Sequence, residues 1–313
     1  MRLNGMIEAS LRNKKLVFIV GSPRSGTTWL RMLLSQSPRV VTTRATHLYS
    51  DYFRSFIDSR TRFAGLEAGL NGLVTDAEAD QWIREFSTLC FDRAAAQRPD
   101  ATVIVEKTPG HSTCGADILR LFPNSAFIHV VRDPRAVVVS LRAASRSWGA
   151  SWAPGQLVDA CEMWKSHVDQ AQRIADLTTR YCEVIYERLH EDGVGEILRL
   201  FEWLGEPIAH DVAASYVEAC AFNRVRPDTA ALSKKKADKR FFRQGKPDGW
   251  RGELTPTEIA AVEHLAGEPM RFFGYEPVAQ RRERAVALVR LRASGVARLL
   301  EGASKRVADG LAP

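Results

Sequence analysis

The chain has 313 residues, of which 45% are apolar and 26% are charged, and its formal net charge is +7. This length is sufficient for one large α/β domain with insertions or for two small domains. The positive charge favours anionic ligands in general. No basic module with interleaved aromatic residues accompanies it, so the sequence predicts no nucleic-acid partner.

The cysteines show no pattern that a disulfide framework or a zinc site requires. They are Cys90, Cys114, Cys161, Cys182 and Cys220. An odd, scattered set predicts reduced thiols in a cytoplasmic protein. No stretch approaches the roughly 20 apolar residues that span a bilayer, and the first 15 residues lack the apolar region of a signal peptide. We therefore expect a cytoplasmic protein without a transmembrane segment.

A buried strand, a glycine-bounded loop and a helix follow one another in residues 16–35. Residues 16–20 are all apolar, as in a strand that is buried on both faces of a parallel sheet. Gly21 and Gly26 bound the loop, and a helix is expected from Thr27. Free backbone N–H groups and the positive end of the helix dipole converge at such a junction. The loop therefore predicts a site for a phosphate-like group.

This loop departs from the Walker pattern G-x-x-x-x-G-K-[ST] of nucleoside triphosphatases. Gly21 and Gly26 match the pattern, but Thr27 stands where its lysine belongs. A cation stands earlier in the loop, at Arg24. Both features disfavour ATP or GTP hydrolysis. However, Asp133 follows an apolar run as a Walker B aspartate does, which keeps a nucleotide kinase or nucleotidase as an alternative.

Further strands are expected where short apolar runs end in turn residues, at 40–43, 102–105, 126–131 and 181–186. Helices are expected between or after them, at 116–122, 134–144, 156–178 and 195–204. A capping box at 255–258 starts another helix. This alternation predicts an α/β fold of the P-loop-like type, with a mostly parallel sheet covered by helices on both faces.

Two segments stand outside this alternation. Residues 48–98 form a predicted helical insertion, and its expected packing residues are Phe53, Phe56, Trp82, Ile83, Phe86 and Leu89. Residues 278–313 form a basic, roughly amphipathic helical tail. The tail is expected to pack on the main domain, residues 1–277, or on an oligomer partner, with a peripheral membrane contact as the alternative.

Four segments resemble motifs of the sulfotransferases that use 3′-phosphoadenosine 5′-phosphosulfate (PAPS). PRSGTTW at 23–29 resembles their phosphosulfate-binding loop, and VRDPR at 131–135 with Ser140 resembles their 3′-phosphate-binding strand and helix. Residues 243–251 are similar to the R-K-G-x-x-G-D-W-K loop, with Gln for Lys and the Gly-Asp order reversed. Tyr186, followed by Glu, resembles the adenine-side Tyr-Glu pair. These motifs cover most of the predicted core.

The resemblance implies metal-free, in-line transfer of a sulfuryl group from PAPS to a hydroxyl or phenol, with adenosine 3′,5′-bisphosphate (PAP) as the product. The cofactor-binding residues that it implies are Arg24, Ser25, Gly26, Thr27, Thr28, Trp29, Arg132, Ser140, Tyr186, Arg243 and Gly245. Arg24 is also expected to stabilise charge on the bridging oxygen. The acceptor stays open between a peptide tyrosine, a sugar, a lipid and a small natural product.

The general base is where the sequence departs from its relatives. Tyrosylprotein- and heparan-type members carry a Glu at the position of Ala45, which cannot accept a proton. His47 is the nearest titratable substitute, and histidine ordinarily titrates near neutrality. A second cluster, in an E-K-T-P segment like that of heparan-type members, holds Glu106, Lys107 and His111. The predicted order of candidates is His47, His111 and Glu106, with Lys107 near the reaction centre. The loss of the Glu leaves a non-catalytic adenine-nucleotide-binding protein as a second alternative.

Overall fold

The computed structural model describes residues 13–63, 65, 69–221 and 246–293. Tertiary contacts divide the chain into two compact units. We call Met1–Arg132 with Met163–Pro247 the sheet unit, and Asp133–Glu162 with Asp248–Pro313 the helical unit. Each unit is described by itself.

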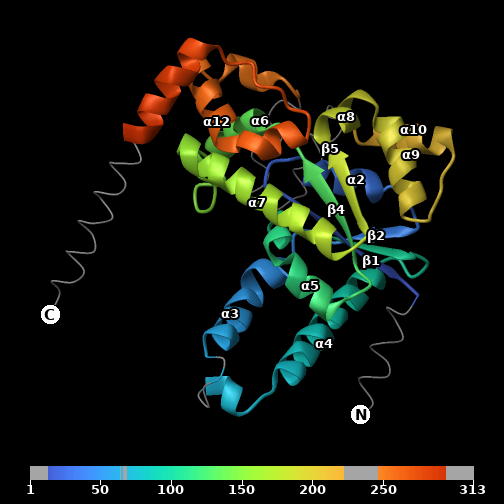
Figure 1. Cartoon of the computed structure of the whole chain (residues 1–313). Coiled ribbons are helices and arrows are strands. Elements are labelled where there is room, and N and C mark those ends of the chain that lie inside the picture. Colours follow the sequence, from blue (N-terminus) through green and yellow to red (C-terminus); the bar gives the residue numbers. More distant parts are fainter. Residues whose placement is uncertain (1–12, 64, 66–68, 222–245, 294–313) are drawn as a thin grey trace. The chain divides into compact units, whose positions relative to one another are not determined.

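The sheet unit is built on five parallel strands in the order β2-β3-β1-β4-β5 (Figure 1). The strands are β1 Lys15–Gly21, β2 Val40–Thr42, β3 Val103–Lys107, β4 Ala126–Val131 and β5 Tyr181–Ile185. Every pairing between neighbours is parallel, as the unbroken apolar runs predict. The predicted α/β fold is therefore confirmed.

The register of the strands gathers the predicted motifs at one edge of the sheet. Ile19 of β1 pairs with Lys107 of β3, and Gly21 pairs with Val130 of β4. Val131 in turn pairs with the last residue of β5. The loops that follow β1, β3, β4 and β5 therefore start side by side, at the carboxyl edge where open parallel sheets bind ligands.

Alternate side chains of the strands enter two apolar layers. On one face, Val17 and Ile19 of β1 pack with α2 (Thr27–Leu34), α8 (Tyr186–Glu191), α9 (Gly193–Trp203) and α10 (His210–Ala219). On the other face, Phe18 packs with α4 (Asp76–Ala95), α5 (Gly115–Leu121) and the later part of α7 (Leu157–Leu177). Both faces of the sheet are thus covered, as the sequence predicts.

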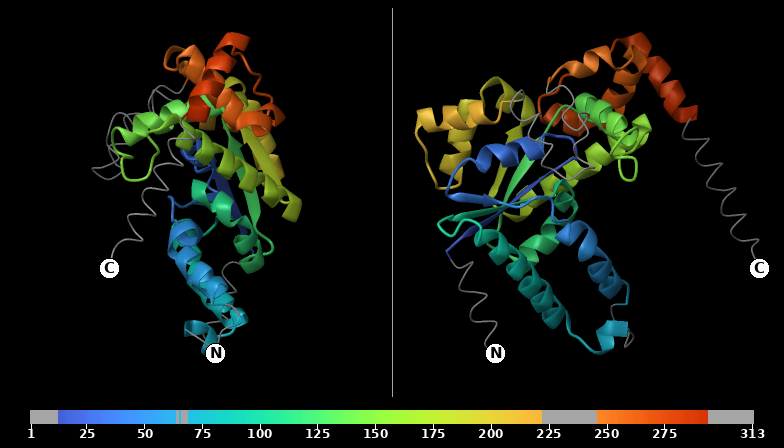
Figure 2. Two further views of the ribbon diagram at one scale, coloured as in Figure 1. Left: turned by 60° about the vertical axis from the view of Figure 1, so that its left-hand side comes forward. Right: turned by 180° about the vertical axis from the view of Figure 1, so that it is seen from behind.

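The helical insertion begins with a π-helical turn, η1 (Leu48–Tyr52), which leads into α3 (Arg54–Arg62). A 3-10 turn, η2 (Gly69–Gly72), precedes α4. The capping box of Thr75 and Glu78 starts α4. In Figures 1 and 2, α3 and α4 extend side by side away from the sheet. Hydrogen bonds tie the insertion to the end of β3 through its first turn, η1.

The packing expected within the insertion is partly wrong. Ile83 is buried as predicted, but Trp82, Phe86 and Leu89 are 51%, 53% and 47% exposed. The side of α4 that meets the core passes through Ile83 and Phe91, and the three exposed residues lie on another side of the helix. A helical pattern with two apolar stripes does not show which stripe faces the protein.

The helical unit contains α6 (Pro134–Ser145), a 3-10 turn η5 (Gly249–Gly252), α12 (Pro256–Phe272) and a helix through residues 281–293. α12 starts at the predicted capping box and continues across a kink at Gly267, where φ is 55°. Ala287 of the tail is buried against Ala260 and Ala261 of α12. The described part of the tail thus packs within its own unit; residues 294–313 lie outside the described residues, and the oligomer and membrane contacts stay predictions.

In the described part of the chain, no helix combines the length and apolar character that crossing a membrane requires.

Candidate functional site

The loop between β1 and α2 leaves hydrogen-bond donors unused. Gly26 is the N-cap of α2, where no side chain caps the helix and no acidic residue lies in the first turn. The hydroxyl of Ser25 is buried and has no hydrogen-bond partner among the described residues. Because a helix N-terminus carries partial positive charge and free N–H groups, this junction fits an anionic group. Thr27, buried, and Thr28, half-buried, occupy the first turn of the same helix.

Close packing and unusual backbone angles fix the shape of this loop. A Cβ atom on Gly21, where φ is 137°, would lie 2.4 Å from the carbonyl oxygen of Val130. On Gly26, it would lie 2.4 Å from a ring carbon of Tyr186. Arg24 has a φ of 74°, which residues other than glycine rarely adopt. Such strain persists where surrounding structure enforces it, commonly at ligand sites.

An arginine and two aromatic rings stand beside the loop. The guanidinium carbon of Arg132, which follows β4, lies 4.1 Å from the ring centroid of Tyr186, which follows β5. Arg132 also donates hydrogen bonds to the carbonyl oxygens of Arg24 and Lys246, both at 3.3 Å. The ring of Trp29 lies 5.6 Å from that of Tyr186. Burial raises the pKa of Tyr186, although Arg132 and Arg24 act against that shift. Five residues predicted to bind the cofactor thus lie together in the sheet unit: Arg24, Gly26, Trp29, Arg132 and Tyr186.

The remaining predicted cofactor residues are placed differently. Ser140 is buried on α6 of the helical unit. Arg243 and Gly245 lie outside the described residues. The roles of all these residues stay predictions.

A buried carboxylate organises the end of β3. Oε1 of Glu106 accepts hydrogen bonds from the hydroxyls of Thr108 at 2.6 Å and Thr46 at 2.8 Å, and Oε2 lies 2.8 Å from Nδ1 of His111. Burial alone would raise the pKa of Glu106, but His111 and these hydroxyls outweigh it and the net shift is downward. Glu106 is therefore a charged group, fully enclosed by partners that stabilise its charge. Lys107, the next residue, is also buried.

His111 uses both of its ring nitrogens within the protein. Nε2 accepts a hydrogen bond from the backbone N–H of Tyr49 at 3.2 Å, so the proton of a neutral ring resides on Nδ1 and faces Glu106. The side chains of His111 and Glu106 are both 0% exposed. Neither nitrogen has a lone pair available to a substrate hydroxyl. This geometry argues that both residues hold the segment from Thr46 to Tyr49 in place, not that either takes a proton.

His47 is the exposed histidine of the pair predicted from the sequence. Its φ is 57°, and its side chain is 54% exposed. Nδ1 lies 2.9 Å from Oδ2 of Asp51, and the hydroxyl of Ser50 donates to the same oxygen at 2.6 Å. Sequence reasoning missed Asp51. The four-residue spacing between the two side chains was the available signal, and it is common on any helical surface.

The carboxylate that motivated the nucleotidase alternative is already occupied within the helical unit. Asp133 accepts the N–H of Arg135 at 2.8 Å and binds its guanidinium through both oxygens. That guanidinium also binds Glu263 at 2.9 Å and stacks over Trp250 at 4.1 Å. No cluster of three or more potential metal ligands occurs among the described residues. Asp133 therefore caps a helix and pairs with an arginine, which does not favour the nucleotidase.

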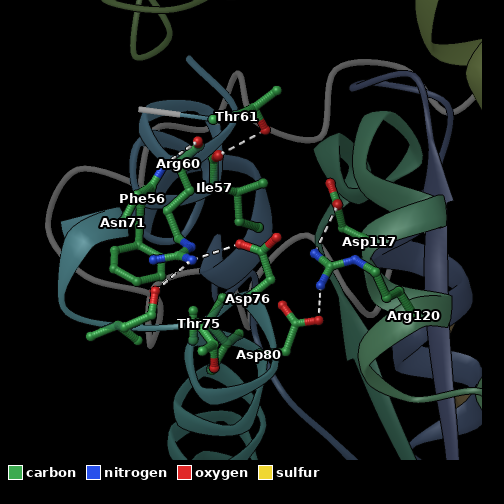
Figure 3. A pocket seen from close by; sticks show the side chains of 14 residues that line it. Phe56, Ile57, Arg60, Thr61, Asn71, Thr75, Asp76, Asp80, Asp117 and Arg120 are labelled. Carbon is green, nitrogen blue, oxygen red and sulfur yellow. Dashed lines mark hydrogen bonds and ion pairs between the residues drawn. The ribbon is translucent and has the colours of Figure 1, made fainter. Parts of the chain in front are cut away.

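A separate cavity of about 730 Å³ lies between α3, α4 and α5. Figure 3 shows Arg120 of α5 between Asp80 and Asp117, and Arg60 of α3 beside Asp76. The carboxylates labelled in this view are thus bound to arginines of the same walls. None of the residues predicted for the cofactor or for catalysis lines this cavity.

Comparison with known protein families covers the residues that form this corner of the sheet unit. The profile of the Sulfotransferase family matches residues 17–211, which is more than half of the chain. The chain belongs to the sulfotransferase family. Its match therefore includes the loop after β1, the cluster after β3 and the corner formed by Arg132 and Tyr186.

Curated relatives of this sulfotransferase-family chain include enzymes that modify protein tyrosine. The protein-tyrosine sulfotransferase of Drosophila melanogaster is 32% identical over 137 residues, which cover 42% of this chain and 26% of that enzyme. Protein-tyrosine sulfotransferase A of Caenorhabditis elegans is 26% identical over 85% of this chain and 68% of its own length. The nodulation protein NoeE of Sinorhizobium fredii is 26% identical over 83% of this chain and 66% of its own.

Solved structures share the fold. The sulfotransferase domain of the Synechococcus olefin synthase matches with a TM-score of 0.54 and 20% identity, over 84% of this chain and 96% of that domain. A mouse sulfotransferase in complex with PAP matches with a TM-score of 0.55 and 17% identity, over 85% and 89%. At these identities the likeness concerns the fold alone.

Proposed function

We propose that this chain transfers a sulfuryl group from PAPS to a hydroxyl or phenol. The observation that carries the proposal is the corner where Arg132 stacks on Tyr186 beside the loop of Arg24, Ser25 and Gly26. That loop offers an uncapped helix N-terminus and a buried, unpartnered hydroxyl, and it lacks a Walker lysine. These features suit a nucleotide that carries a phosphate at each end of its ribose and requires no metal.

In the proposed reaction, separate groups bind the 5′-phosphate, bind the 3′-phosphate and accept the proton. The N–H groups at the start of α2 and the hydroxyl of Ser25 hold the 5′-phosphate, and Arg24 stabilises the charge that develops on its bridging oxygen. Arg132 receives the 3′-phosphate, and Trp29 and Tyr186 flank the adenine. Nε2 of His47 takes the proton of the acceptor as its oxygen attacks sulfur. The S–O bond to the nucleotide breaks, and PAP leaves with the electron pair.

The acceptor class is proposed from chemistry and from the relatives. A neutral imidazole near pH 7 is a suitable base for a phenol or an alcohol. Relatives named as protein-tyrosine sulfotransferases act on a phenol side chain. A phenol, either peptide tyrosine or a small molecule, is therefore the first acceptor to test.

Thermal unfolding with nucleotides tests the donor. Because a ligand at a hundredfold excess over its Kd stabilises the native state by about 2.7 kcal/mol, PAP is expected to raise Tm without magnesium, and AMP or ADP much less. Arg132→Ala is expected to reduce the PAP shift to the AMP value. The matched control is Arg180→Ala, which changes an exposed arginine next to the amino end of β5 and is expected to leave the PAP shift unchanged.

Two results would contradict the proposal. A magnesium-dependent shift with ATP and none with PAP would favour a kinase or nucleotidase. A PAP shift without transfer to any acceptor in a panel of phenols, tyrosyl peptides, sugars and alcohols would favour a nucleotide-binding protein without catalysis.

A further inference from the structure

The turn that carries His47 is built unlike an ordinary helix start. The carbonyl oxygen of His47 accepts hydrogen bonds from the N–H groups of both Asp51, at 3.0 Å, and Tyr52, at 3.2 Å. This closes the single π-helical turn η1, and π-turns occur frequently at functional sites. The φ of 57° at His47 adds backbone strain that a purely structural turn would avoid.

Buried groups hold this strained backbone in place. Oγ1 of Thr108 accepts the N–H groups of Thr46, at 3.0 Å, and His47, at 3.2 Å, while its own hydrogen goes to Glu106. His111 accepts the N–H of Tyr49 on the other side of the turn. Three backbone N–H groups before and within η1 are therefore held by Thr108 and His111, and both of these residues contact the buried Glu106. Such support is what a reactive side chain needs to keep one orientation.

The π-turn places Asp51 against one nitrogen of His47 and leaves the other nitrogen exposed. Oδ2 of Asp51 lies 2.9 Å from Nδ1, and the hydroxyl of Ser50 fixes that oxygen at 2.6 Å. Nε2 makes no hydrogen bond to any residue that the structure describes. Because a carboxylate can only accept a hydrogen bond, Nδ1 carries the proton and donates it to this bond, and the neutral ring keeps its lone pair on Nε2. This is the tautomer that a general base must have on the side of the substrate.

An ordinary surface ion pair stands close by for comparison. Arg54 and Asp58 on α3 have the same i,i+4 spacing, with Nη1 and Oδ1 3.2 Å apart. They need no left-handed residue, no π-turn and no second donor to the carboxylate. The pair of His47 and Asp51 therefore forms on a strained backbone, whereas the pair on α3 forms on a regular helix.

We infer that Asp51 is the positioning residue of His47, which it orients and supports as the general base of the transfer. This inference rests on the proposed function. While Nε2 takes the acceptor proton and the new S–O bond forms, the ring becomes an imidazolium whose Nδ1–H faces the carboxylate. The bond from sulfur to the nucleotide breaks in the same step, and water later removes the proton from Nε2. Asp51 stays ionised throughout and touches neither the acceptor nor the nucleotide.

The charged surroundings of this pair are few. The elements packed against η1 are α3 and the 3-10 turn η3 (Pro109–Cys114). Their charged and titratable residues are Arg54, Asp58, Arg60 and Arg62 on α3 and His111 and Cys114 on η3. Burial alone would raise the pKa of Asp51, but Ser50 and His47 lower it and the net shift is downward, with a smaller lowering contribution from His111. Of these neighbours only Asp58 is changed in the variants below, where it serves as the control.

The first experiment is ¹⁵N NMR of labelled histidine side chains, with His47 assigned by its loss in His47→Gln. The neutral ring of the wild-type protein is expected to carry its proton on Nδ1. In Asp51→Asn a mixture of both tautomers is expected, because an amide side chain can donate a hydrogen bond to Nδ1 as well as accept one from it. Asp58→Asn, which removes the ordinary pair, is expected to leave His47 unchanged.

The second experiment measures kcat/KM against pH with PAPS and 2-naphthol. Activity is lost when the base is protonated. Because Asp51→Asn removes the negative charge beside the imidazolium, the acid limb of its profile is expected to move toward lower pH. The rate on the plateau is expected to fall about tenfold or more. Asp51→Glu, which keeps the charge, is expected to restore the acid limb. A residue that merely supported the turn would lower the rate and leave the limb where it is.

Three outcomes would overturn the inference. The first is a folded Asp51→Asn protein in which the neutral ring of His47 keeps its proton on Nδ1 alone. The second is an acid limb that does not move although the plateau falls. The third is normal turnover by His47→Ala, which removes the base assignment together with its positioning residue. In that last case an unchanged PAP shift of Tm would show that the proposed nucleotide function survives.

Discussion

Two histidine–carboxylate pairs lie near the carboxyl end of β3, and they differ mainly in burial. The nitrogen–oxygen distances are 2.8 Å for His111 with Glu106 and 2.9 Å for His47 with Asp51. The first pair is 0% exposed on both sides, whereas the second is 54% and 63% exposed. Similar nitrogen–oxygen distances thus occur in two different settings. Enclosure makes the first pair an anchor for backbone groups, and access to solvent leaves the second a nitrogen that can react.

The largest expected effect comes from breaking the buried pair. His111→Leu leaves the carboxylate of Glu106 enclosed without its main partner, so the free energy of unfolding is expected to fall by about 3 to 5 kcal/mol. His47→Leu changes an exposed pair, which contributes about 0 to 1 kcal/mol. Urea unfolding of both variants measures the difference. Equal losses would mean that burial does not separate the two pairs.

The effects on turnover are expected to rank the two pairs in the opposite order to the effects on stability. His47→Ala removes the proposed base, so kcat is expected to fall about 100-fold or more while the PAP shift of Tm is retained. The measurement is single-turnover transfer from PAPS to a phenol. An active His47→Ala protein together with an inactive but folded His111→Ala protein would reverse the assignment of the two histidines.

Thr108 connects the two pairs, and its loss sharpens the comparison. Thr108→Val keeps the shape of the side chain but leaves the N–H of His47 without its acceptor and removes a donor from Glu106. The N–H of Thr46 loses one of its two acceptors and keeps Oε1 of Glu106. The free energy of unfolding is expected to fall by about 1 to 3 kcal/mol. Amide hydrogen exchange at residues 46–52 is expected to accelerate more than exchange in β4. Unchanged exchange at η1 would show that the buried pair does not hold the turn.

Two further buried histidines show what burial does when the partner is a hydroxyl instead of a carboxylate. Nδ1 of His129 lies 2.6 Å from Oη of Tyr181, and Nδ1 of His167 lies 2.7 Å from Oγ of Ser112. Burial lowers the pKa of His129 to about 3 and that of His167 to about 4. Both rings are therefore neutral in the folded protein at pH 6, whereas in the unfolded chain they titrate near pH 6.5.

This difference predicts a loss of stability in acid. A histidine whose folded pKa is depressed contributes fully above pH 6.5, and the contribution is lost as the pH falls toward the folded value. Between pH 7 and pH 6 each ring is expected to remove about 0.7 kcal/mol from the free energy of unfolding. His167→Asn should reduce that pH dependence, and chemical unfolding at both pH values measures it.

The sequence was sufficient for the elements with strong local patterns. The five strands and the loop after β1 were predicted because an unbroken apolar run and a bounding glycine have few other interpretations. The resemblance to PAPS-dependent sulfotransferases assigned Arg24, Arg132 and Tyr186 to one nucleotide, and in the structure these residues lie together because parallel strands end at one edge. In contrast, Trp82 was misplaced, because a helix with two apolar stripes does not reveal its inner side.

The roles of the histidines could not be separated from the sequence for a physical reason. His47 and His111 each follow a short strand and are each near polar residues, and their burial depends on a contact made over more than 60 positions in the chain. The π-turn that brings Asp51 to His47 has no residue pattern of its own. Asp51 became visible only when the backbone conformation of His47 was known.

The position of β1 in the middle of the sheet has a consequence for the synthesis of this protein on the ribosome. β1 is made first, yet its neighbours β3 and β4 begin at Val103 and Ala126, and β5 follows at Tyr181. Until those segments emerge, the backbone N–H and C=O groups of β1 have no neighbouring strand to pair with. Its loop also lacks Arg132 and Tyr186. A nascent chain that ends before β5 is therefore expected to depend on chaperones and to bind no nucleotide. The sheet is complete only when β5, the last of its strands in the sequence, has been synthesised.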